Sequence, residues 1–253
     1  MDKPLLINKR KFDIRCFVLV TAINGNLWAY WYKDGYIRTS CKEFTLKNVT
    51  NKFIHLTNDA IQKKSENYGK FEPGNKLSYN EFQKHFDQNA SDLGIDMENN
   101  IIPQMKKIAW DSIKATYRQL DKSGRHHTFE VFGYDFMVDD SQLVKLIEVN
   151  TNPCLELSSN YLSRIIPAMI DDWIKIAVDP IFPAPESKNM RKSQVPDYGD
   201  SGFELMFNKL KDSASIININ QSEVIIEEDE DDDREDGDGD DNDDPDDEES
   251  DLE

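Results

Sequence analysis

The sequence predicts an α/β fold of the α+β kind, in which a mainly antiparallel sheet is flanked by helices and followed by a disordered acidic tail. Three features predict it: apolar runs of strand length joined by short turns, longer runs with helical apolar spacing, and an acidic C-terminal stretch. The chain has 253 residues, of which 38% are hydrophobic. That content allows one large domain or two small ones.

The formal net charge of -19 comes from the C-terminal segment. Residues 223–253 contain 21 acidic side chains and one arginine, so the other 222 residues are nearly neutral, with 28 acidic and 29 basic side chains. Residues 227–253 contain too few apolar side chains to offset the entropy of folding, and we expect a disordered acidic tail. Residues 184–226 are expected to form a polar linker, whose apolar run at 203–207 predicts a short docking helix.

Cysteine usage and hydropathy indicate the compartment. Cys16, Cys41 and Cys154 form neither a CxxC pair nor a Cys/His cluster, which argues against a disulfide framework and a zinc site. No apolar run approaches the roughly 18 residues of a membrane span. The N-terminus lacks the apolar core of a secretory signal. We therefore expect a soluble, cytoplasmic protein that binds neither membrane nor nucleic acid.

The first strands are predicted at residues 10–20, 27–32 and 36–40. Turn sequences at residues 24–26 (Asn-Gly-Asn) and 33–35 (Lys-Asp-Gly) join them into a three-stranded meander. In the first strand, Asp13 and Arg15 form a charge pair on an otherwise apolar face. Residues 65–78, with several glycine and proline breakers, predict a long loop.

Three helices are predicted further along the chain, at about 78–85, 103–120 and 158–180. Ser78 is an N-cap candidate, and Glu81 stands at the capping-box position three residues later. The third helix begins at Ser158 or Ser159. In the second, apolar residues recur at helical spacing, which indicates a core-facing stripe rather than a cofactor site.

Residues 129–140 (FEVFGYDFMVDD) and 143–154 (LVKLIEVNTNPC) predict the antiparallel hairpin around which the chain is organised. If Val138 pairs with Leu143 across a turn at 139–142, Asp135 lies opposite Leu146. The two-residue period of a strand then places Leu146, Glu148 and Asn150 on the face of Asp135.

Two carboxylates and an amide oxygen on one face repel one another unless a cation lies between them, and a hard divalent cation prefers this oxygen set. Mg²⁺ is the natural candidate. The alternative is that Asp135 and Glu148 simply face solvent on a half-exposed sheet.

The sequence resembles the tubulin-tyrosine ligase family, which has the ATP-grasp fold. The resemblance covers roughly residues 3–183, and its motifs occur in the family's order and spacing: RKFDIRCFVLV, GYIRTS, HLTNDAIQKK followed by ENYGKFEPGN, FGYDFMVD and LIEVNTNP. It implies a ligase that uses ATP and Mg²⁺ to activate a carboxylate as an acylphosphate, which an amine then attacks to form an amide.

The resemblance also implies the partners. They would be the acidic C-terminal tail of tubulin and a free amino acid, in a protein that is cytoplasmic and associated with microtubules or cilia. HLTN followed by an NYG loop favours tyrosine as the added amino acid. A glutamate or glycine ligase on the same scaffold is the alternative within the enzyme class. From another class, the alternative is a non-catalytic tubulin-binding relative.

Nine residues fall on functional positions of the family. The resemblance implies magnesium ligands at Asp135, Glu148 and Asn150, nucleotide contacts at Lys11, Asp13, Thr57 and Asn58, and arginines near the transferring phosphate and the acceptor at Arg15 and Arg38. The planar fork of arginine suits two-point contact with carboxylate or phosphate.

Simpler structural roles are open for some of these residues. Arg15 and Asp13 are also explained by a structural ion pair. Thr57 and Asn58 are also explained as a helix cap, and Arg38 as a solvated strand end.

The family carries a lysine, a glycine-rich loop and an adenine hinge upstream of the KPLL stretch, and none of these occurs in this chain. We therefore expect residues 1–183 to hold the magnesium and acceptor half of a site and to bind ATP poorly. We also expect the start codon to be an internal methionine of a longer gene. A further hypothesis is that the acidic tail imitates a tubulin tail and competes for the groove containing Arg15 and Arg38.

Overall fold

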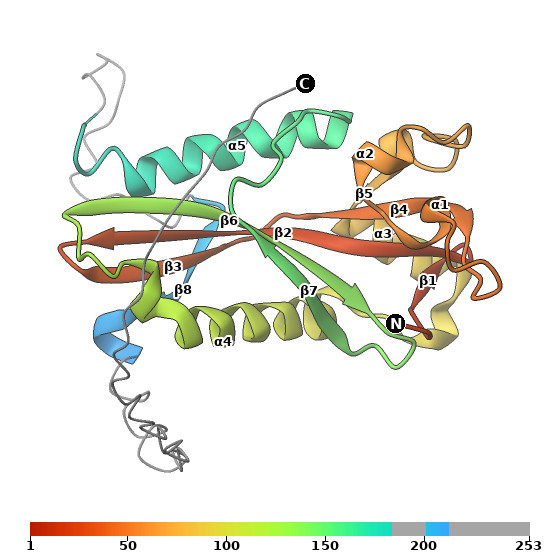
Figure 1. Ribbon diagram of the computed structural model, residues 1–253, viewed down its shortest axis with the longest axis horizontal. Helices are drawn as coiled ribbons and strands as arrows, with labels where there is room; N and C mark the ends of the chain where they lie inside the picture. Colours follow the sequence, from red (N-terminus) through yellow and green to blue (C-terminus); the bar gives the residue numbers. More distant parts are fainter. Residues whose placement is uncertain (184–200, 213–253) are drawn as a thin grey trace, which may run out of the picture.

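The computed structural model describes residues 1–183 and 201–212. In this part of the chain a mostly antiparallel sheet lies between helix α4 (Ile102–Leu120) on one face and helix α5 (Asn160–Ala177) on the other (Figure 1). The sheet has eight strands: β1 (Leu6–Ile7), β2 (Arg10–Ile23), β3 (Asn26–Tyr32), β4 (Tyr36–Glu43), β5 (Lys76–Ser78), β6 (His127–Val138), β7 (Val144–Asn150) and β8 (Phe203–Asn208). The predicted fold class is confirmed.

Smaller helices cover the end of the sheet near β4 and β5. They are α1 (Lys52–His55), α2 (Asp59–Gln62), α3 (Tyr79–Asn89) and the single turns Pro73–Asn75, Ser91–Leu93 and Met97–Ile101. Ser78 and Glu81 form the predicted capping box of α3, and Ser159 caps α5. None of the helices in the described ranges is both long and apolar enough to cross a membrane.

Strand β2 is the centre of the sheet. Its alternating side chains enter two different cores: Ile14, Cys16 and Val18 pack toward α4, whereas Phe17 and Leu19 pack toward α5. The predicted stripe of α4 runs from Ile102 to Leu120. Its members through Ile113 lie in the first core, Tyr117 packs against that core, and Leu120 is exposed. The assignment of the strands and long helices from apolar periodicity is therefore confirmed.

The predicted meander is wrong in its third strand. β3 pairs with residues 18–23 of β2 and β4 pairs with residues 10–15, so both strands follow the same edge of β2 in turn. Residues 33–35 therefore connect them without reversing the chain. Glycine is needed there because a Cβ on Gly35 would lie 2.0 Å from the Tyr79 hydroxyl and 2.4 Å from the Arg15 carbonyl oxygen.

The expected docking helix at 203–207 is also wrong, because these residues form strand β8, paired antiparallel with β3. A five-residue helix is marginal in water, whereas the outer edge of β3 offers backbone partners. Phe203 and Phe207 are buried in the two cores. The predictions for the rest of the linker and for the acidic tail fall outside the described residues. The long loop predicted at 65–78 ends in β5, which pairs with β4.

The β6–β7 hairpin forms with a register different from the predicted one. Val138 pairs with Val144, Phe136 with Leu146, and Asp135 with Glu148. The turn has three residues between Asp139 and Leu143, with Gln142 at φ 65°, as in hairpin loops that end in a left-handed residue. This turn shifts the pairing by one residue relative to the predicted register. An irregularity between Asp135 and Phe136 adds a second one-residue shift.

Candidate active site

The two register shifts bring the predicted metal-binding side chains together. A shift of two residues in total keeps Glu148 and Asn150 on the face of Asp135, whereas Leu146 moves to the other face. Glu148 lies directly opposite Asp135, and Asn150 lies opposite Gly133. The Asn150 amide nitrogen is 3.2 Å from Glu148 Oε1 and 3.4 Å from Asp135 Oδ2. The three side chains therefore converge on one point of the sheet.

Asp135 is bound by both predicted catalytic arginines. Arg15 donates from Nε to Oδ1 at 2.5 Å and from Nη2 to Oδ2 at 2.9 Å, and Arg38 Nη2 lies 2.9 Å from Oδ2. Arg38 also forms a two-point ion pair with Asp13. These ion pairs follow from the strand pairing. Arg15 of β2 stands opposite Asp135 of β6, and Asp13 of β2 stands opposite Arg38 of β4. All four side chains are buried.

Two of the simpler expectations are therefore wrong. Arg15 pairs with Asp135 across the sheet, and its printed carboxylate partner is not Asp13. Arg38 is not a solvated strand end, because it is 8% exposed. Burial alone would raise the pKa of Asp135, but the hydrogen bond from Arg15 and the charge of Arg38 outweigh it and hold that pKa below its usual value. The carboxylate is therefore ionised at neutral pH.

A cavity of about 440 Å³ opens beside these arginines. Of the predicted site residues, it is lined by Arg15, Arg38, Asn58, Glu148 and Asn150. Both arginines bind carboxylates through Nε and Nη2, so each Nη1 amino group keeps donors for an anionic ligand in the cavity. Asp135 lies behind them and fixes the direction of both guanidinium groups.

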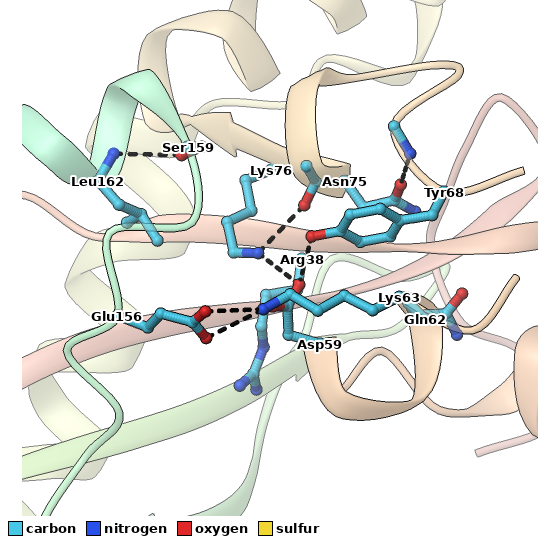
Figure 2. Close-up of polar contacts among 12 residues, drawn as sticks. Arg38, Asp59, Gln62, Lys63, Tyr68, Asn75, Lys76, Glu156, Ser159 and Leu162 are labelled. Atoms are coloured by element: carbon cyan, nitrogen blue, oxygen red, sulfur yellow. Dashed lines mark hydrogen bonds and ion pairs between the residues drawn. The ribbon is translucent and has the colours of Figure 1, made fainter.

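A polar network also lines the cavity (Figure 2). Asp59 accepts from Lys76 Nζ at 2.7 Å and from the Tyr68 hydroxyl at 2.8 Å, and it also binds Lys63 at 2.9 Å. Lys63 reaches Glu156, in the segment after β7, at 2.9 Å. These bonds connect α2, the loop before β5 and the segment leading to α5. Asp59, Lys63, Lys76 and Glu156 all line the cavity.

Sequence reasoning missed Asp59, Lys63, Lys76 and Glu156. Asp59 directly follows Asn58 in the HLTND motif, so a functional role for that motif was the available signal. Burial alone would raise the pKa of Asp59, but its bonds to Lys76, Lys63 and Tyr68 lower it. Lys76 gave no signal, because it was assigned to a loop, and only the β4–β5 pairing places it opposite Arg38.

The residues predicted to contact nucleotide are not gathered at this cavity. Lys11 donates to the His55 carbonyl oxygen at 2.8 Å, and burial lowers its pKa against the raising effect of Asp13. Asp13 is buried against Arg38, and Thr57 does not line the cavity. Asn58 lines it and is also the N-cap residue of α2, although its side chain makes no capping bond.

A glycine makes room for the central arginine. Gly133 lies next to Asp135 on the same face of β6, and the Arg15 guanidinium packs over it. A Cβ at this position would lie 3.2 Å from Arg15 Nη1 and 2.8 Å from Pro153 Cβ. The missing side chain therefore lets Arg15 lie flat between the sheet and the segment that follows β7.

The donor set fits a hard divalent cation once the Asn150 amide turns over. Glu148 is exposed and its carboxylate has no arginine partner within the described residues, and Asp135 keeps one free lone pair on Oδ1. Asn150 directs its amide nitrogen to both carboxylates, so its oxygen becomes a ligand only with the amide in the opposite orientation. In the described part of the chain no group of three or more His, Cys, Asp or Glu side chains has metal-binding geometry. Any ion here would therefore rely on two carboxylates, an amide, water and substrate oxygens.

Comparison with known families agrees with this arrangement. The model of the tubulin-tyrosine ligase family matches residues 1–186, which include every element of the cavity. The chain belongs to the tubulin-tyrosine ligase family. The resemblance seen in the sequence motifs is thereby confirmed.

Relatives within the tubulin-tyrosine ligase family carry two kinds of name. Tubulin glycylase 3D of Tetrahymena thermophila is 33% identical over 90% of this chain, and tubulin glycylase 3A of Drosophila melanogaster is 33% identical over 71%. A probable tubulin polyglutamylase of Bos taurus is 33% identical over 70% of this chain. The chain spans 22%, 18% and 37% of the lengths of these three proteins, respectively.

Proposed function

We propose that this chain carries the amide-forming part of an ATP-dependent ligase that adds glycine or glutamate to a tubulin tail. The proposal rests on one observation: oxygen ligands for a cation and cationic donors for an anion line the same cavity. Glu148 and Asn150 offer oxygen ligands on one side, and Arg15 and Arg38 offer fixed cationic donors beside them. Such a site suits a reaction between two anionic substrates, a carboxylate and a nucleotide phosphate.

In the proposed reaction, a glutamate carboxylate of the acceptor attacks the terminal phosphate of ATP and forms an acylphosphate, with ADP leaving. The amino group of the free amino acid then attacks the acyl carbon, phosphate leaves, and the amine loses a proton as the amide forms. Arg15 and Arg38 hold the acceptor carboxylate and stabilise the charge that develops on the phosphoryl oxygens. Mg²⁺ held by Asp135, Glu148 and Asn150 would supply the positive charge that neutralises phosphate oxygens.

The relatives do not favour the tyrosine addition expected from the sequence, because the names they carry are glycylase and polyglutamylase. The cavity favours glycine as the first candidate. Its two lysines are already neutralised, Lys63 by Asp59 and Glu156, and Lys76 by Asp59. A glutamate side chain would have to displace one of these carboxylates, whereas glycine needs no further partner. Glutamate is the second candidate because of the bovine relative.

The test is incorporation of labelled glycine, glutamate or tyrosine into tubulin by the full chain with Mg²⁺ and a large excess of ATP, because residues 1–183 are expected to bind ATP poorly. We expect incorporation of glycine, or else glutamate, with ADP formed in equal amount. Glu148→Gln should lower the rate about 100-fold, equivalent to about 2.7 kcal/mol in the barrier. Glu66→Gln, an exposed carboxylate away from the cavity, is the matched control and should leave the rate unchanged.

Three outcomes would contradict the proposal. Incorporation of tyrosine alone would overturn the choice of amino acid. Tubulin binding without ADP formation would favour the non-catalytic alternative. Equal rates for Glu148→Gln and Glu66→Gln would remove Glu148 from the reaction.

A further inference from the structure

We propose that the acidic segment 227–253 docks on a basic surface of the same chain, at the C-terminal end of α4. This surface consists of Lys114, Arg118, Lys122, Arg125 and Lys209. It lies at the opposite end of the sheet from the β4–β5 edge, near the turn between β2 and β3. Docking there does not depend on the proposed ligase function.

Two adjoining cavities bring the basic residues together. Arg118, Lys122 and Lys209 line a cavity of about 250 Å³ beside Gly25. Lys122 and Arg125 line a second cavity of about 650 Å³, which extends along β6. Lys114 stands one helical turn before Arg118 on α4. Lys122 belongs to both cavities, so the basic side chains form one continuous surface.

The charges of this surface are not neutralised by ion pairs within the described residues. Elsewhere on α4, Lys107 binds Asp111 and Lys106 binds Glu204. By contrast, Lys114 lies 4.7 Å from the ring centroid of Trp110, and Arg118 lies 5.7 Å from that of Tyr117. An aromatic ring orders a cation without cancelling its charge.

Acidic residues in the same two cavities are fewer than the basic ones. They are Asp121 and Glu130, against Arg118, Lys122, Arg125 and Lys209, so the residues that line the two cavities carry a net charge of about +2 at neutral pH. The surface therefore attracts an acidic ligand.

The described part of the chain after β8 ends close to the basic surface, so the acidic segment is tethered near it. Lys209 donates to the Gly25 carbonyl oxygen at 2.7 Å, and the residues after β8 lie beside the end of α4 (Figure 1). Residues 213–226 can span at most about 50 Å when extended. A segment tethered this closely has an effective concentration in the millimolar range. Weak electrostatic contacts are then enough to keep it on the surface.

The site cavity is a poorer match for this segment than the basic surface. The hypothesis from the sequence placed the tail at Arg15 and Arg38, but both guanidinium groups are bound to Asp13 and Asp135 and keep only their Nη1 groups, which suffice for one acceptor carboxylate and not for a run of acidic side chains. The lysines of the site cavity are also paired with carboxylates. A segment with 20 acidic residues and one arginine would meet nearly balanced charge there.

Docking at the basic surface would also affect the ligase proposed above, and this consequence rests on that proposed function. Thr151 lines the 650 Å³ cavity, and its neighbours Asn150 and Asn152 line the site cavity. Residues 127–132 of β6 pair with β2 on one side, and in the described part of the chain β7 pairs only with residues 133–138 on the other. The acidic segment would therefore cover an open strand edge that leads toward the site.

Zero-length carbodiimide cross-linking of the full chain tests the docking, because this reagent joins only carboxylates and amines that are in contact. We expect peptides from 227–253 joined to Lys114 and Lys122 within one molecule. Exposed lysines away from the surface, Lys64, Lys70 and Lys84, should give severalfold lower yields. Lys209 is left out of the comparison, because its closeness in sequence makes its cross-links uninformative.

A pair of variants separates docking from chance contact. Arg118→Gln with Arg125→Gln keeps both reporter lysines, adds no new carboxylate for the reagent and weakens the attraction, and should lower the cross-link yields of these lysines severalfold. Lys70→Gln with Lys84→Gln removes two charges elsewhere and should not lower those yields. The yields should also fall as salt rises from about 0.01 M to about 1 M, over which the Debye length shortens from about 30 Å to about 3 Å.

Equal yields at all exposed lysines, or yields at Lys114 and Lys122 that do not respond to the arginine variants, would overturn the proposal. Both arginines are exposed and form no ion pair within the described residues, so folding of the variants is expected and is checked by circular dichroism. Cross-links found only between molecules would mean that the surface binds another copy, and would also overturn it. None of these outcomes depends on ligase activity.

Discussion

The two halves of strand β2 differ in what they contribute to the molecule. Residues 16–23 lie between β3 and β6, and their buried side chains are apolar apart from Thr21. Residues 10–15 pair with β4, and Arg10, Asp13 and Arg15 are all buried there at 1%, 2% and 5% exposure. The apolar half gains free energy from burial, whereas each buried charge must be matched by a partner to recover its desolvation cost.

The difference indicates that residues 10–15 of β2 contribute less to stability than residues 16–23 and serve the chemistry of the site. Every buried charge in the polar half has a charged partner: Arg10 binds Glu72, Asp13 binds Arg38, and Arg15 binds Asp135. Replacing such pairs by apolar residues of similar volume is often neutral or stabilising. Buried charge of this kind beside a cavity is typical of a functional site. Five predictions test this contrast, beginning with the largest expected effect.

Asp135→Asn should lower the free energy of unfolding by about 3–5 kcal/mol, because it leaves two buried guanidinium groups with one carboxylate between them. Urea denaturation measures the loss. Asp111→Asn on the exposed face of α4 is the control and should change stability by less than about 0.5 kcal/mol. Similar losses for the two variants would mean that the buried pairs contribute no more than a surface pair.

The same comparison has a defined pH dependence. Because the folded pKa of Asp135 is lowered, its contribution is complete above the ordinary carboxyl pKa of about 3.9 and is lost as pH falls through the folded value. The stability difference between the wild type and Asp135→Asn should therefore be constant near neutrality and shrink below about pH 4. A difference that grows on acidification would contradict the assigned ion pairs.

Leu19→Ala, in the apolar half, should cost about 2–5 kcal/mol through lost burial and the cavity that remains. Leu19→Met nearly conserves volume and should cost less than about 1.5 kcal/mol. Neither variant should alter ligase activity per folded molecule, measured at a temperature where both are folded. A large loss of activity with either would mean that the two halves are not separable.

Ser78→Ala should lower stability by about 1 kcal/mol, because it removes the capping box of α3, which packs over the polar half through Phe82 against Phe12. Thermal denaturation measures the change. Ser123→Ala, in an exposed turn, is the matched control and should have no effect. An equal melting temperature for Ser78→Ala and the wild type would show that the capping hydrogen bonds of Ser78 do not stabilise the protein.

The smallest effect is expected for the pair Lys63 and Glu156, which lie at the mouth of the cavity with side chains 39% and 59% exposed. A double-mutant cycle with Lys63→Met and Glu156→Gln should give a coupling energy of only about 0.2–1 kcal/mol. The exposed pair Lys107 and Asp111 is the control and should give a similar value. A much larger coupling energy for Lys63 and Glu156 would mean that the cavity excludes water better than the exposure of these two side chains indicates.

The apolar half of β2 and its neighbours could be predicted from sequence, since period-two alternation and turn residues act locally. Capping signals likewise located Ser78 and Ser159. The pairing order could not be predicted, because residues 33–35 resemble a hairpin turn and only the length of β2 lets β3 and β4 follow one edge. Strand β8 was missed for a similar reason, since its partner edge is set by the tertiary fold.

The site was predicted in part. Asp135, Glu148 and Asn150 were placed on one face by an argument whose register was wrong, and it held only because two one-residue shifts restore the original face. The partners of Arg15 and Arg38 depend on which strands lie on each side of β2, which no local pattern specifies. Asp59 and Glu156 come from segments far apart in sequence and meet only through Lys63.

Gly133 has a consequence for engineering the protein. The Arg15 guanidinium lies over the Gly133 hydrogen atom that a side chain would replace, because a methyl group at that position would lie 3.2 Å from Nη1 and 2.8 Å from Pro153 Cβ. An alanine at position 133 would push the Arg15 guanidinium away from Asp135, and every ionisable side chain would still be present. The orientation of the charge could then be tuned separately from its presence.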